Sequence, residues 1–352
     1  MSRNKVLLEE ASRIKCNNVV AFEPENIFYM TGFWGEVIAL SNGSSVKLIA
    51  PKLEADRARK SSRNCQVIES ERGSDMIKSL LSNLTNGNVC TDSNDYATIE
   101  KIRQKIGNRL IHNVDPFYKA RKIKDSKEIE IIAKASRILD KLFAICEEIK
   151  PNVTEKQLQA TLLYEAMNLG AYPPSYRFTV SPLIIASGIN SSLPHADPTD
   201  RKIRKGDLVT VDLTLRYNGY IADATRTFAV GTIDSEKKKI YHIVKEAQER
   251  GLDAVKAGAK CGAVDNACRS FIKRAGYGKY FIHSTGHGIG LEVHEPPWLR
   301  MKNDEVLQKN MTVTVEPGIY LPNKFGVRIE DSAIVDKKVR VLNKYTKDLI
   351  IL

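Results

Sequence analysis

Residues 206–225 read GDLVTVDLTLRYNGYIADAT, two runs of alternating polar and apolar residues around the pair Asn218-Gly219. An Asn-Gly pair between such runs is typical of a two-residue type I′ turn that joins two antiparallel strands. Because side chains alternate between the two faces of a strand, the register of this turn brings polar residues together. It predicts four of them on one face of the hairpin: Asp212 opposite Thr225, and Thr214 opposite Asp223.

The two aspartates of this hairpin are diagonal neighbours, about 7–8 Å apart at the backbone. Carboxylates at that spacing can converge on one cation. A polar outer face of the hairpin is the alternative interpretation, and this segment alone does not decide between the two.

The hairpin lies between stretches with helical spacing of apolar residues. A capping box at residues 125–128 begins a helix that ends before Pro151, and a second one at 154–157 begins a helix that Gly170 closes. Two more helices are expected at about 236–256 and 264–275, and a second pair of strands at 311–316 and 326–335. Two helices followed by paired strands, twice over, predict two similar αα-ββ halves.

The N-terminal part of the chain alternates between short strands and helices, which indicates a small α/β domain. Strands are expected at 18–22, 36–40, 46–50, 65–68 and 88–90, and helices at 53–61 and 74–84. This part holds no cluster of catalytic residue types. The pattern changes at about residue 121, so we expect one domain over 1–121 and a second over 122–352.

The composition of the 352 residues, with 42% hydrophobic and 27% charged residues, is that of a soluble globular protein. No apolar run is long enough for a membrane helix, and the N-terminus lacks the pattern of a secretory signal. Six cysteines without a CxxC motif predict reduced thiols and a cytoplasmic protein. The net charge of +12 raises the question of nucleic-acid binding, but the basic clusters are mixed with acids, so we expect a solvated surface instead.

Histidines gather in the segment HSTGHGIGLEVHE at residues 283–295, which contains His283, His287 and His294. A lone histidine is more often a packed or surface residue than a ligand. Three within twelve positions reverse that expectation, and the glycines beside His287 allow the backbone to approach closely. His195 is a fourth candidate, in the stretch LPHA at 193–196.

Two further carboxylates lie in apolar strand-like runs, Glu316 in TVEPG and Glu330 in VRIED. A carboxylate there is costly to bury unless it is paired or bound to a cation. An ion pair with Arg328 is the structural alternative for Glu330. Five residues then form one candidate set that could hold two divalent cations about 3.5–4 Å apart: Asp212, Asp223, His287, Glu316 and Glu330. Without metal, the four carboxylates would repel one another.

The motifs occur in a fixed order: ASGINSSLPHA at 186–196, the two-aspartate hairpin, GHGIG at 286–290 continuing to HEP at 294–296, EPG at 316–318 and RIE at 328–330. In this order they resemble the pita-bread metallopeptidases, in particular the branch of Xaa-Pro dipeptidases (prolidases) and aminopeptidases P. The stretch PENIFYMTGF at 24–33 resembles the small N-terminal domain of that branch. The resemblance implies an α+β protein, with a small α/β N-terminal domain before a pita-bread catalytic domain of two αα-ββ halves.

The resemblance also implies a role for each site residue. Asp212 would bind one metal ion, His287 and Glu316 would bind the other, and Asp223 and Glu330 would bridge the two. His195, His283 and His294 would line the substrate pocket. Arg328 would orient Glu330, and Thr225 would be a supporting partner beside Asp212.

The implied reaction is hydrolysis of a proline-containing dipeptide. A hydroxide held between two divalent ions would attack the carbonyl that precedes proline, while His294 donates to the oxyanion and Glu316 takes and returns the proton. Manganese or cobalt suits the oxygen-rich ligand set, with zinc or iron as alternatives. The branch also implies a homodimer.

Two alternatives remain open from the sequence: an aminopeptidase P acting on longer peptides, and an inactive pita-bread binding module. One departure bears on the substrate. Several dipeptidases of this kind carry an arginine four residues after the histidine that matches His294, and here that position is Trp298. We therefore expect His195 or Arg300 to pair with the substrate carboxylate.

Overall fold

The computed structural model describes residues 2–43, 45–175 and 183–352. The chain forms two compact units, Met1–Arg121 and Lys122–Leu352, called here the N-terminal unit and the C-terminal unit. Among the described residues, no helix is both long and apolar enough to cross a lipid bilayer.

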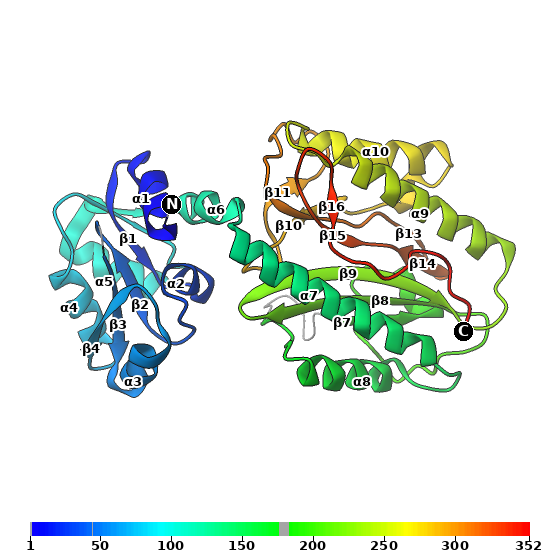
Figure 1. The fold of residues 1–352 in the computed structure, drawn as a ribbon, viewed down its shortest axis with the longest axis horizontal. Helices are drawn as coiled ribbons and strands as arrows, with labels where there is room; N and C mark the ends of the chain where they lie inside the picture. The colour runs from blue at the N-terminus through cyan, green and yellow to red at the C-terminus, as the bar shows by residue number, and fades with distance from the viewer. Residues whose placement is uncertain (1, 44, 176–182) are drawn as a thin grey trace. The chain divides into compact units, whose positions relative to one another are not determined.

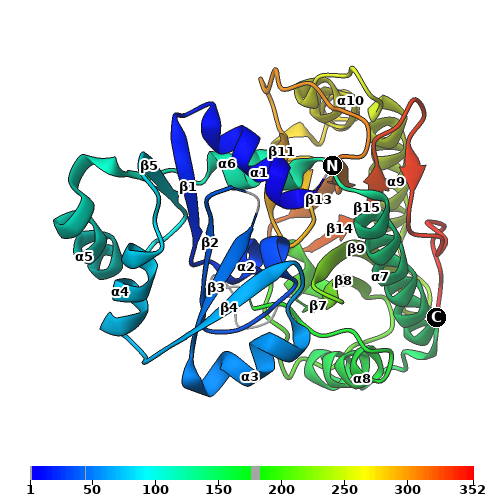
Figure 2. The ribbon, with the colours of Figure 1, turned by 60° about the vertical axis from the view of Figure 1, so that its left-hand side comes forward.

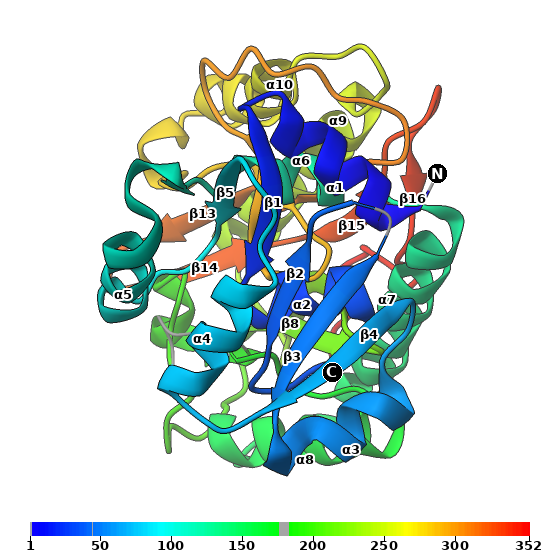
Figure 3. The same ribbon diagram turned by 90° about the vertical axis from the view of Figure 1, so that its left-hand side faces the viewer.

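The N-terminal unit is a six-stranded mixed sheet with helices, in the strand order β4-β3-β2-β1-β5-β6 (Figure 3). Its elements are α1 (Arg3–Ser12), β1 (Cys16–Ala21), α2 (Pro24–Thr31), β2 (Ile38–Ser41), β3 (Val46–Pro51), α3 (Lys52–Ser61), β4 (Cys65–Ser70), α4 (Ser74–Ser82), β5 (Asn88–Thr91), α5 (Tyr96–Ile106), η1 (Gly107–Arg109) and β6 (Leu110–His112). Helix α6 (Asp115–Lys122) leads to the next unit. The five strands expected from the sequence are β1 to β5, whereas α1, α2 and α5 were not predicted.

The C-terminal unit follows the expected order of two helices and strands, twice over. Its first half contains α7 (Ser126–Ile145), η2 (Cys146–Glu148), α8 (Glu155–Asn168), β7 (Leu183–Ser187), η3 (Gly188–Ser192), β8 (Leu208–Tyr217) and β9 (Tyr220–Ala229). Its second half contains α9 (Ser235–Ala254), α10 (Cys261–Arg274), η4 (Gly278–Tyr280), β10 (Gly286–Gly288), β11 (Glu295–Leu299), β12 (Thr312–Val315), β13 (Gly318–Leu321), β14 (Phe325–Arg328), β15 (Asp331–Ile334) and β16 (Arg340–Val341). Both predicted capping boxes are present, at Asp125 with Glu128 and at Thr154 with Gln157.

Each half packs its helix pair against its own sheet. Helices α7 and α8 share a hydrophobic core with the sheet β7-β8-β9, and α9 and α10 share one with strands of the sheet β11-β10-β12-β15-β16. The helices lie on the outside of the unit with the strands between them (Figure 1). The hairpin β13-β14 lies beside β8 and β9 (Figure 2), where the Thr227 hydroxyl donates to the Arg328 carbonyl at 2.9 Å. The strands of the two halves therefore meet in the middle of the unit.

The hairpin β8-β9, which carries the two aspartates, has the predicted register. Strands β8 and β9 pair with Asp212 opposite Thr225 and Thr214 opposite Asp223. Asn218 and Gly219 have φ values of 48° and 89°, the left-handed conformation that a type I′ turn requires of both central residues.

The second predicted strand pair, 311–316 with 326–335, is only partly correct. Strand β12 pairs with β15, but the short hairpin β13-β14 is inserted between them. Pro317 has no backbone N–H to donate and follows the end of β12. Beyond β14 the chain leaves its partner at Ile329, and Glu330 forms an isolated antiparallel bridge with Thr225 on β9. This bridge joins the two sheets next to the predicted site.

Candidate metal centre

The hairpin β8-β9 buries the two aspartates that the sequence singled out. Asp212 and Asp223 are only 9% and 5% exposed. The Thr214 hydroxyl, directly opposite Asp223, donates to Asp223 Oδ1 at 2.9 Å. The face they share is therefore buried, which rules out a solvated outer surface of the hairpin.

Strand β10 brings His287 to the same place. Its Nε2 lies 3.4 Å from Glu316 Oε1 and 3.9 Å from Asp223 Oδ2. Its Nδ1 lies 3.1 Å from the Gly288 carbonyl oxygen, so a proton on Nδ1 leaves the Nε2 lone pair directed at the carboxylates. The residue before His287 must be glycine, because a Cβ at Gly286 would overlap the Thr314 carbonyl oxygen on the neighbouring strand β12.

The supporting contacts of Asp212 and Glu330 differ from those expected. Arg328 does not bond to Glu330: its Nη2 donates to Asp212 Oδ2 at 2.6 Å, and its Nε donates to Thr225 Oγ1 at 3.2 Å. The Thr225 hydroxyl in turn donates to Glu330 Oε2 at 2.8 Å instead of supporting Asp212. The prediction that Arg328 orients Glu330 was therefore wrong in the partner, because the strand is interrupted between these two residues. Thr225 lies opposite Asp212 and supports the cluster as predicted, through its hydrogen bond to Glu330.

Two oxygen atoms of this cluster are left without a partner. Asp212 Oδ1 and Glu330 Oε1 are buried, and in the described part of the chain neither has a hydrogen-bond partner. Buried polar atoms of this kind are rarely left unsatisfied in proteins unless a water molecule or an ion serves them. Ligand atoms of Asp223, His287 and Glu330 lie within 4.8 Å of one another. A carboxylate-rich set with one imidazole suits a divalent cation, so the residues present fit such an ion.

Burial and mutual repulsion shift the protonation of the whole cluster. Burial raises the pKa of Asp223 and of Glu330 well above their usual range, and the neighbouring carboxylates raise both further. Burial also raises the pKa of Glu316 to about 8, although Arg328 partly opposes this shift. Burial lowers the pKa of His287 to about 3, helped by His294. In the metal-free cluster these shifts favour the protonated forms of Asp223, Glu316 and Glu330 and the neutral imidazole of His287.

These pKa shifts make the stability of the metal-free protein depend on pH. From pH 6.5, the ordinary pKa of histidine, to pH 8, the folded protein holds protons on these carboxyls that the unfolded chain has already released. Its free energy of unfolding should therefore fall with rising pH, by about 2 kcal/mol for Glu316, or about 4–8 °C in melting temperature, with Asp223 and Glu330 acting in the same direction. Thermal unfolding of chelator-treated protein at several pH values measures this. Saturating Mn²⁺ should remove the decline, and a melting temperature that rises over this range without metal would contradict it.

The three other predicted histidines differ in their surroundings. His283 Nδ1 lies 2.7 Å from the Ser284 carbonyl oxygen and its Nε2 lies 2.9 Å from the Tyr320 hydroxyl, so both ring nitrogens are engaged. The His294 ring is T-shaped to that of His287, with centroids 4.3 Å apart. His195 is exposed and is near enough to His283 and His294 to lower their pKa values.

Trp298 stands where several related dipeptidases carry an arginine, and Arg300 lies two residues further on. Trp298 faces His287 in the register of β10 and β11, and its ring centroid is 6.4 Å from that of His294. It therefore forms an apolar wall beside the cluster. Arg300 is exposed, and among the described residues no hydrogen bond or ion pair connects its side chain with the cluster. Its pairing with the substrate carboxylate stays a prediction.

Two residues that contribute to the site, Tyr320 and Lys124, were not predicted from the sequence. The buried Tyr320 hydroxyl accepts from Arg328 Nη1 at 2.6 Å and so connects His283 with the arginine that holds Asp212. Its place on a short strand just after Glu316-Pro317-Gly318 was the available signal. Lys124 forms a buried ion pair at 2.8 Å with Glu295, the residue after His294. No local pattern joins residues so distant in sequence.

The fold and this buried acidic cluster are those of a metallopeptidase. Residues 130–337 match the metallopeptidase family M24, and residues 3–123 match the creatinase/prolidase N-terminal domain. The chain belongs to the metallopeptidase family M24. The family expected from the motifs is thereby confirmed, as is the fold of a small N-terminal domain followed by a pita-bread domain.

Named relatives extend over nearly the whole chain. The chain is 37% identical to an Xaa-Pro dipeptidase of Pyrococcus furiosus, over 95% of both sequences. The crystal structure of a prolidase from Pyrococcus horikoshii has a TM-score of 0.91 at 35% identity, covering 99% of this chain and 100% of that one. An X-Pro aminopeptidase from Thermotoga maritima has a TM-score of 0.89 at 32% identity, with both chains fully covered.

Proposed function

We propose that the protein is a metal-dependent Xaa-Pro dipeptidase. The observation that carries this proposal is the buried group of Asp223, His287 and Glu330, beside two unpartnered carboxylate oxygens, in a chain of family M24. A cluster of this composition is costly without a cation, and a protein that only bound partners would have no need of it. The relatives named Xaa-Pro dipeptidase or prolidase support the choice of substrate.

Two divalent cations would be held by five side chains: Asp212 on one ion, His287 and Glu316 on the other, and Asp223 and Glu330 on both. When bound, such ions supply Lewis acidity and a nucleophile at neutral pH. Manganese or cobalt is proposed, with zinc or iron as alternatives, because oxygen donors dominate the set. Arg328 would hold Asp212 through its 2.6 Å ion pair, and Thr225 would hold Glu330.

The chain's own residues would handle the proton and the oxyanion. Burial lowers the pKa of His294, so its imidazole is neutral at neutral pH and can donate one N–H to the carbonyl oxygen of the substrate. Glu316 would take a proton and return it to the proline nitrogen, because its carboxylate, with Oε1 3.4 Å from His287 Nε2, lies beside the ions that the cluster would hold. His195 and His283 would line the pocket, with His283 held in one orientation by Ser284 and Tyr320.

The peptide bond before proline requires a specialised peptidase site for a physical reason. The Xaa-Pro bond is a tertiary amide without an N–H and with a fixed φ, so a site that holds an extended peptide through that N–H fails. Here the apolar ring of Trp298 beside His294 offers a wall for the proline ring. No backbone N–H of the substrate is needed for that contact.

An aminopeptidase that acts on longer Xaa-Pro peptides is the second candidate. Trp298 supplies no positive charge for a carboxylate directly after proline, and the structure named X-Pro aminopeptidase from Thermotoga maritima covers the whole chain. We place the dipeptidase first because His195 is near His283 and His294 and can meet that carboxylate.

Hydrolysis of matched Xaa-Pro and Xaa-Pro-Yaa peptides tests the proposal. We expect the dipeptides to be cut with a kcat/KM at least about tenfold higher, the equivalent of about 1.4 kcal/mol. His195→Gln should raise KM for Xaa-Pro by about tenfold through loss of the carboxylate partner. Arg300→Met tests the other candidate for this role, and an unchanged KM there beside a raised KM in His195→Gln would assign the role to His195. Equal cleavage of both peptide classes by the wild type would favour the aminopeptidase instead.

We also propose a cytoplasmic homodimer. All six cysteines are unpaired, which supports a reducing compartment. The oligomeric state is proposed from the resemblance to prolidases, and light scattering of the full chain measures it.

A further inference from the structure

Beside the cluster, a backbone bridge joins Thr225 on β9 of the three-stranded sheet to Glu330, the residue before β15 of the five-stranded sheet. Glu330 N donates to Thr225 O at 3.1 Å, and Thr225 N donates to Glu330 O at 3.4 Å. Asp223 lies on β9, on one side of this joint, and the Glu330 carboxylate comes from the other side. The separation of these two carboxylates therefore depends on this bridge and on Ser332 of β15, whose hydroxyl donates to the Asp223 carbonyl at 2.7 Å.

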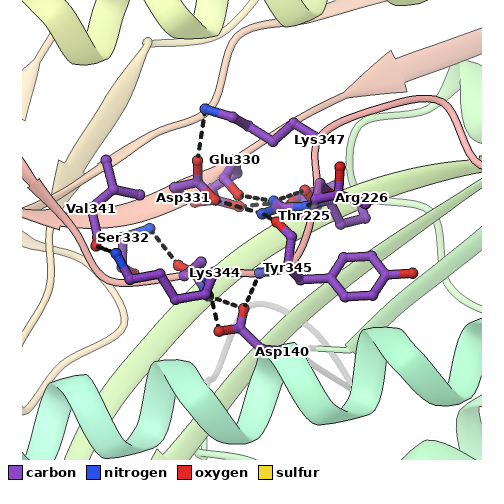
Figure 4. A network of polar contacts seen from close by, with 12 residues as sticks. Asp140, Thr225, Arg226, Glu330, Asp331, Ser332, Val341, Lys344, Tyr345 and Lys347 are labelled. Atoms are coloured by element: carbon purple, nitrogen blue, oxygen red, sulfur yellow. Dashed lines mark hydrogen bonds and ion pairs between the residues drawn. The ribbon is translucent and has the colours of Figure 1, made fainter.

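Arg226, the residue after Thr225, holds this bridge from the side away from the cluster. Its Nη1 donates to the carbonyl oxygens of both bridge residues, Thr225 at 2.9 Å and Glu330 at 2.6 Å. Its Nη2 donates to Asp331 Oδ1 at 2.7 Å and to the Tyr345 carbonyl at 2.9 Å. Its Nε donates to the Thr346 carbonyl at 2.9 Å. Every nitrogen of the guanidinium is thus engaged (Figure 4).

Asp331 completes this arrangement from the strand that follows Glu330. The side chains of Arg226 and Asp331 are 3% and 1% exposed. The second carboxylate oxygen of Asp331 accepts from Gln248 Nε2 at 3.0 Å and pairs with Lys347 at 3.3 Å. A buried ion pair of this kind adds little net stability compared with apolar residues of the same volume, so its fixed geometry is the better reason for its presence.

The alternation of side chains explains why the pair can act on the cluster without touching it. Thr225 and Arg226 are neighbours on β9, and Glu330 and Asp331 are neighbours at the start of β15. One member of each pair, Thr225 and Glu330, faces the cluster, and the other member faces the opposite side. Figure 4 shows the contacts of Arg226 and Asp331 beside Thr225 and Glu330.

We propose that Arg226, together with Asp331, is a positioning residue for the metal centre. By fixing the carbonyls of Thr225 and Glu330, it sets the distance between the Asp223 and Glu330 carboxylates. The proposal rests on the metal centre of the proposed function. It assigns to Arg226 a role in metal affinity, beyond any contribution to folding.

The test is Mn²⁺ binding to the full chain, measured by calorimetry on metal-free protein, together with the visible absorption spectrum of Co²⁺ bound to it. Arg226→Lys keeps the positive charge opposite Asp331, but a single ammonium lacks the planar fork that reaches both carbonyls. We expect its dissociation constant for Mn²⁺ to rise about 10–100-fold, with an altered Co²⁺ spectrum. The melting temperature of the metal-free protein should change much less.

The double variant Arg226→Met with Asp331→Leu removes both buried charges together. It therefore leaves neither charge buried without its partner, and separates a loss of positioning from a folding defect. It should remain folded and still bind Mn²⁺ weakly, because only the two backbone hydrogen bonds of the bridge then hold the two carbonyls. Arg201→Lys is the matched control, since Arg201 forms a two-bond pair with Asp207 at 2.6 and 3.0 Å without contacting the bridge. It should bind Mn²⁺ like the wild type.

Wild-type Mn²⁺ affinity and an unchanged Co²⁺ spectrum in Arg226→Lys or in the folded double variant would overturn the proposal. An equal loss of affinity in Arg201→Lys would overturn it too, because the effect would then be general. A wild type that binds no Mn²⁺ or Co²⁺ would instead contradict the proposed metal centre itself.

Discussion

Glu316→Gln should lower kcat for an Xaa-Pro dipeptide by about 10²–10⁴-fold, the usual range for loss of a positioned proton carrier. Glutamine has the same shape and keeps one oxygen near His287 Nε2, which lies 3.4 Å from Glu316 Oε1. It cannot take up a proton. We therefore expect most of the metal to remain bound while turnover is lost, and kcat and metal content should be measured on the same sample.

Glu246→Gln is the matched control for this change, because Glu246 is exposed on α9 and pairs with Arg250. It should change neither quantity. Unchanged kcat in Glu316→Gln would exclude Glu316 as the proton carrier. Loss of turnover in proportion to lost metal would reduce its role to that of a ligand.

Asp223→Asn should weaken metal retention itself, raising the dissociation constant for Mn²⁺ by at least about 100-fold, the upper end of the range for supporting partners of ligands. Asp223 is the central carboxylate of the cluster, within reach of His287 and hydrogen-bonded by Thr214. Asparagine fills the same space but removes the negative charge that would be shared by two cations. Metal content after gel filtration and calorimetric titration measure the change.

Asp234→Asn is a suitable control, because Asp234 caps α9 by accepting from Lys237 N and asparagine caps a helix equally well. Its metal content should equal that of the wild type. Full metal retention in Asp223→Asn would contradict the bridging role.

Sequence patterns that span only a few residues were sufficient to predict much of the fold. The Asn218-Gly219 turn fixes the register of β8 and β9, and the boxes at Asp125 and Thr154 fix two helix starts. Each of these depends on hydrogen bonds between neighbours in the sequence. Helix α2 had comparable signals, with Pro24 in its first turn and Gly32 at its end, but it was not predicted from them.

Partners within the site could not be predicted in the same way. Arg328 and Glu330 are two positions apart and would share a face of a regular strand, which favoured a contact between them. The chain ends β14 at Arg328 and begins β15 at Asp331, so this periodicity fails at Glu330. Arg328 meets Asp212 instead, a residue 116 positions away. The same limit concealed the Lys124–Glu295 pair and the placement of Arg226 behind the bridge.

The most direct test of the metal centre is a titration of metal-stripped protein with Mn²⁺ or Co²⁺, followed by hydrolysis of an Xaa-Pro dipeptide. The five proposed ligands can hold two cations, and the carboxylates are mutually repulsive without them. We therefore predict no activity in the stripped protein and full recovery at about two equivalents of metal per chain. Full activity in protein that contains no divalent metal would contradict the account.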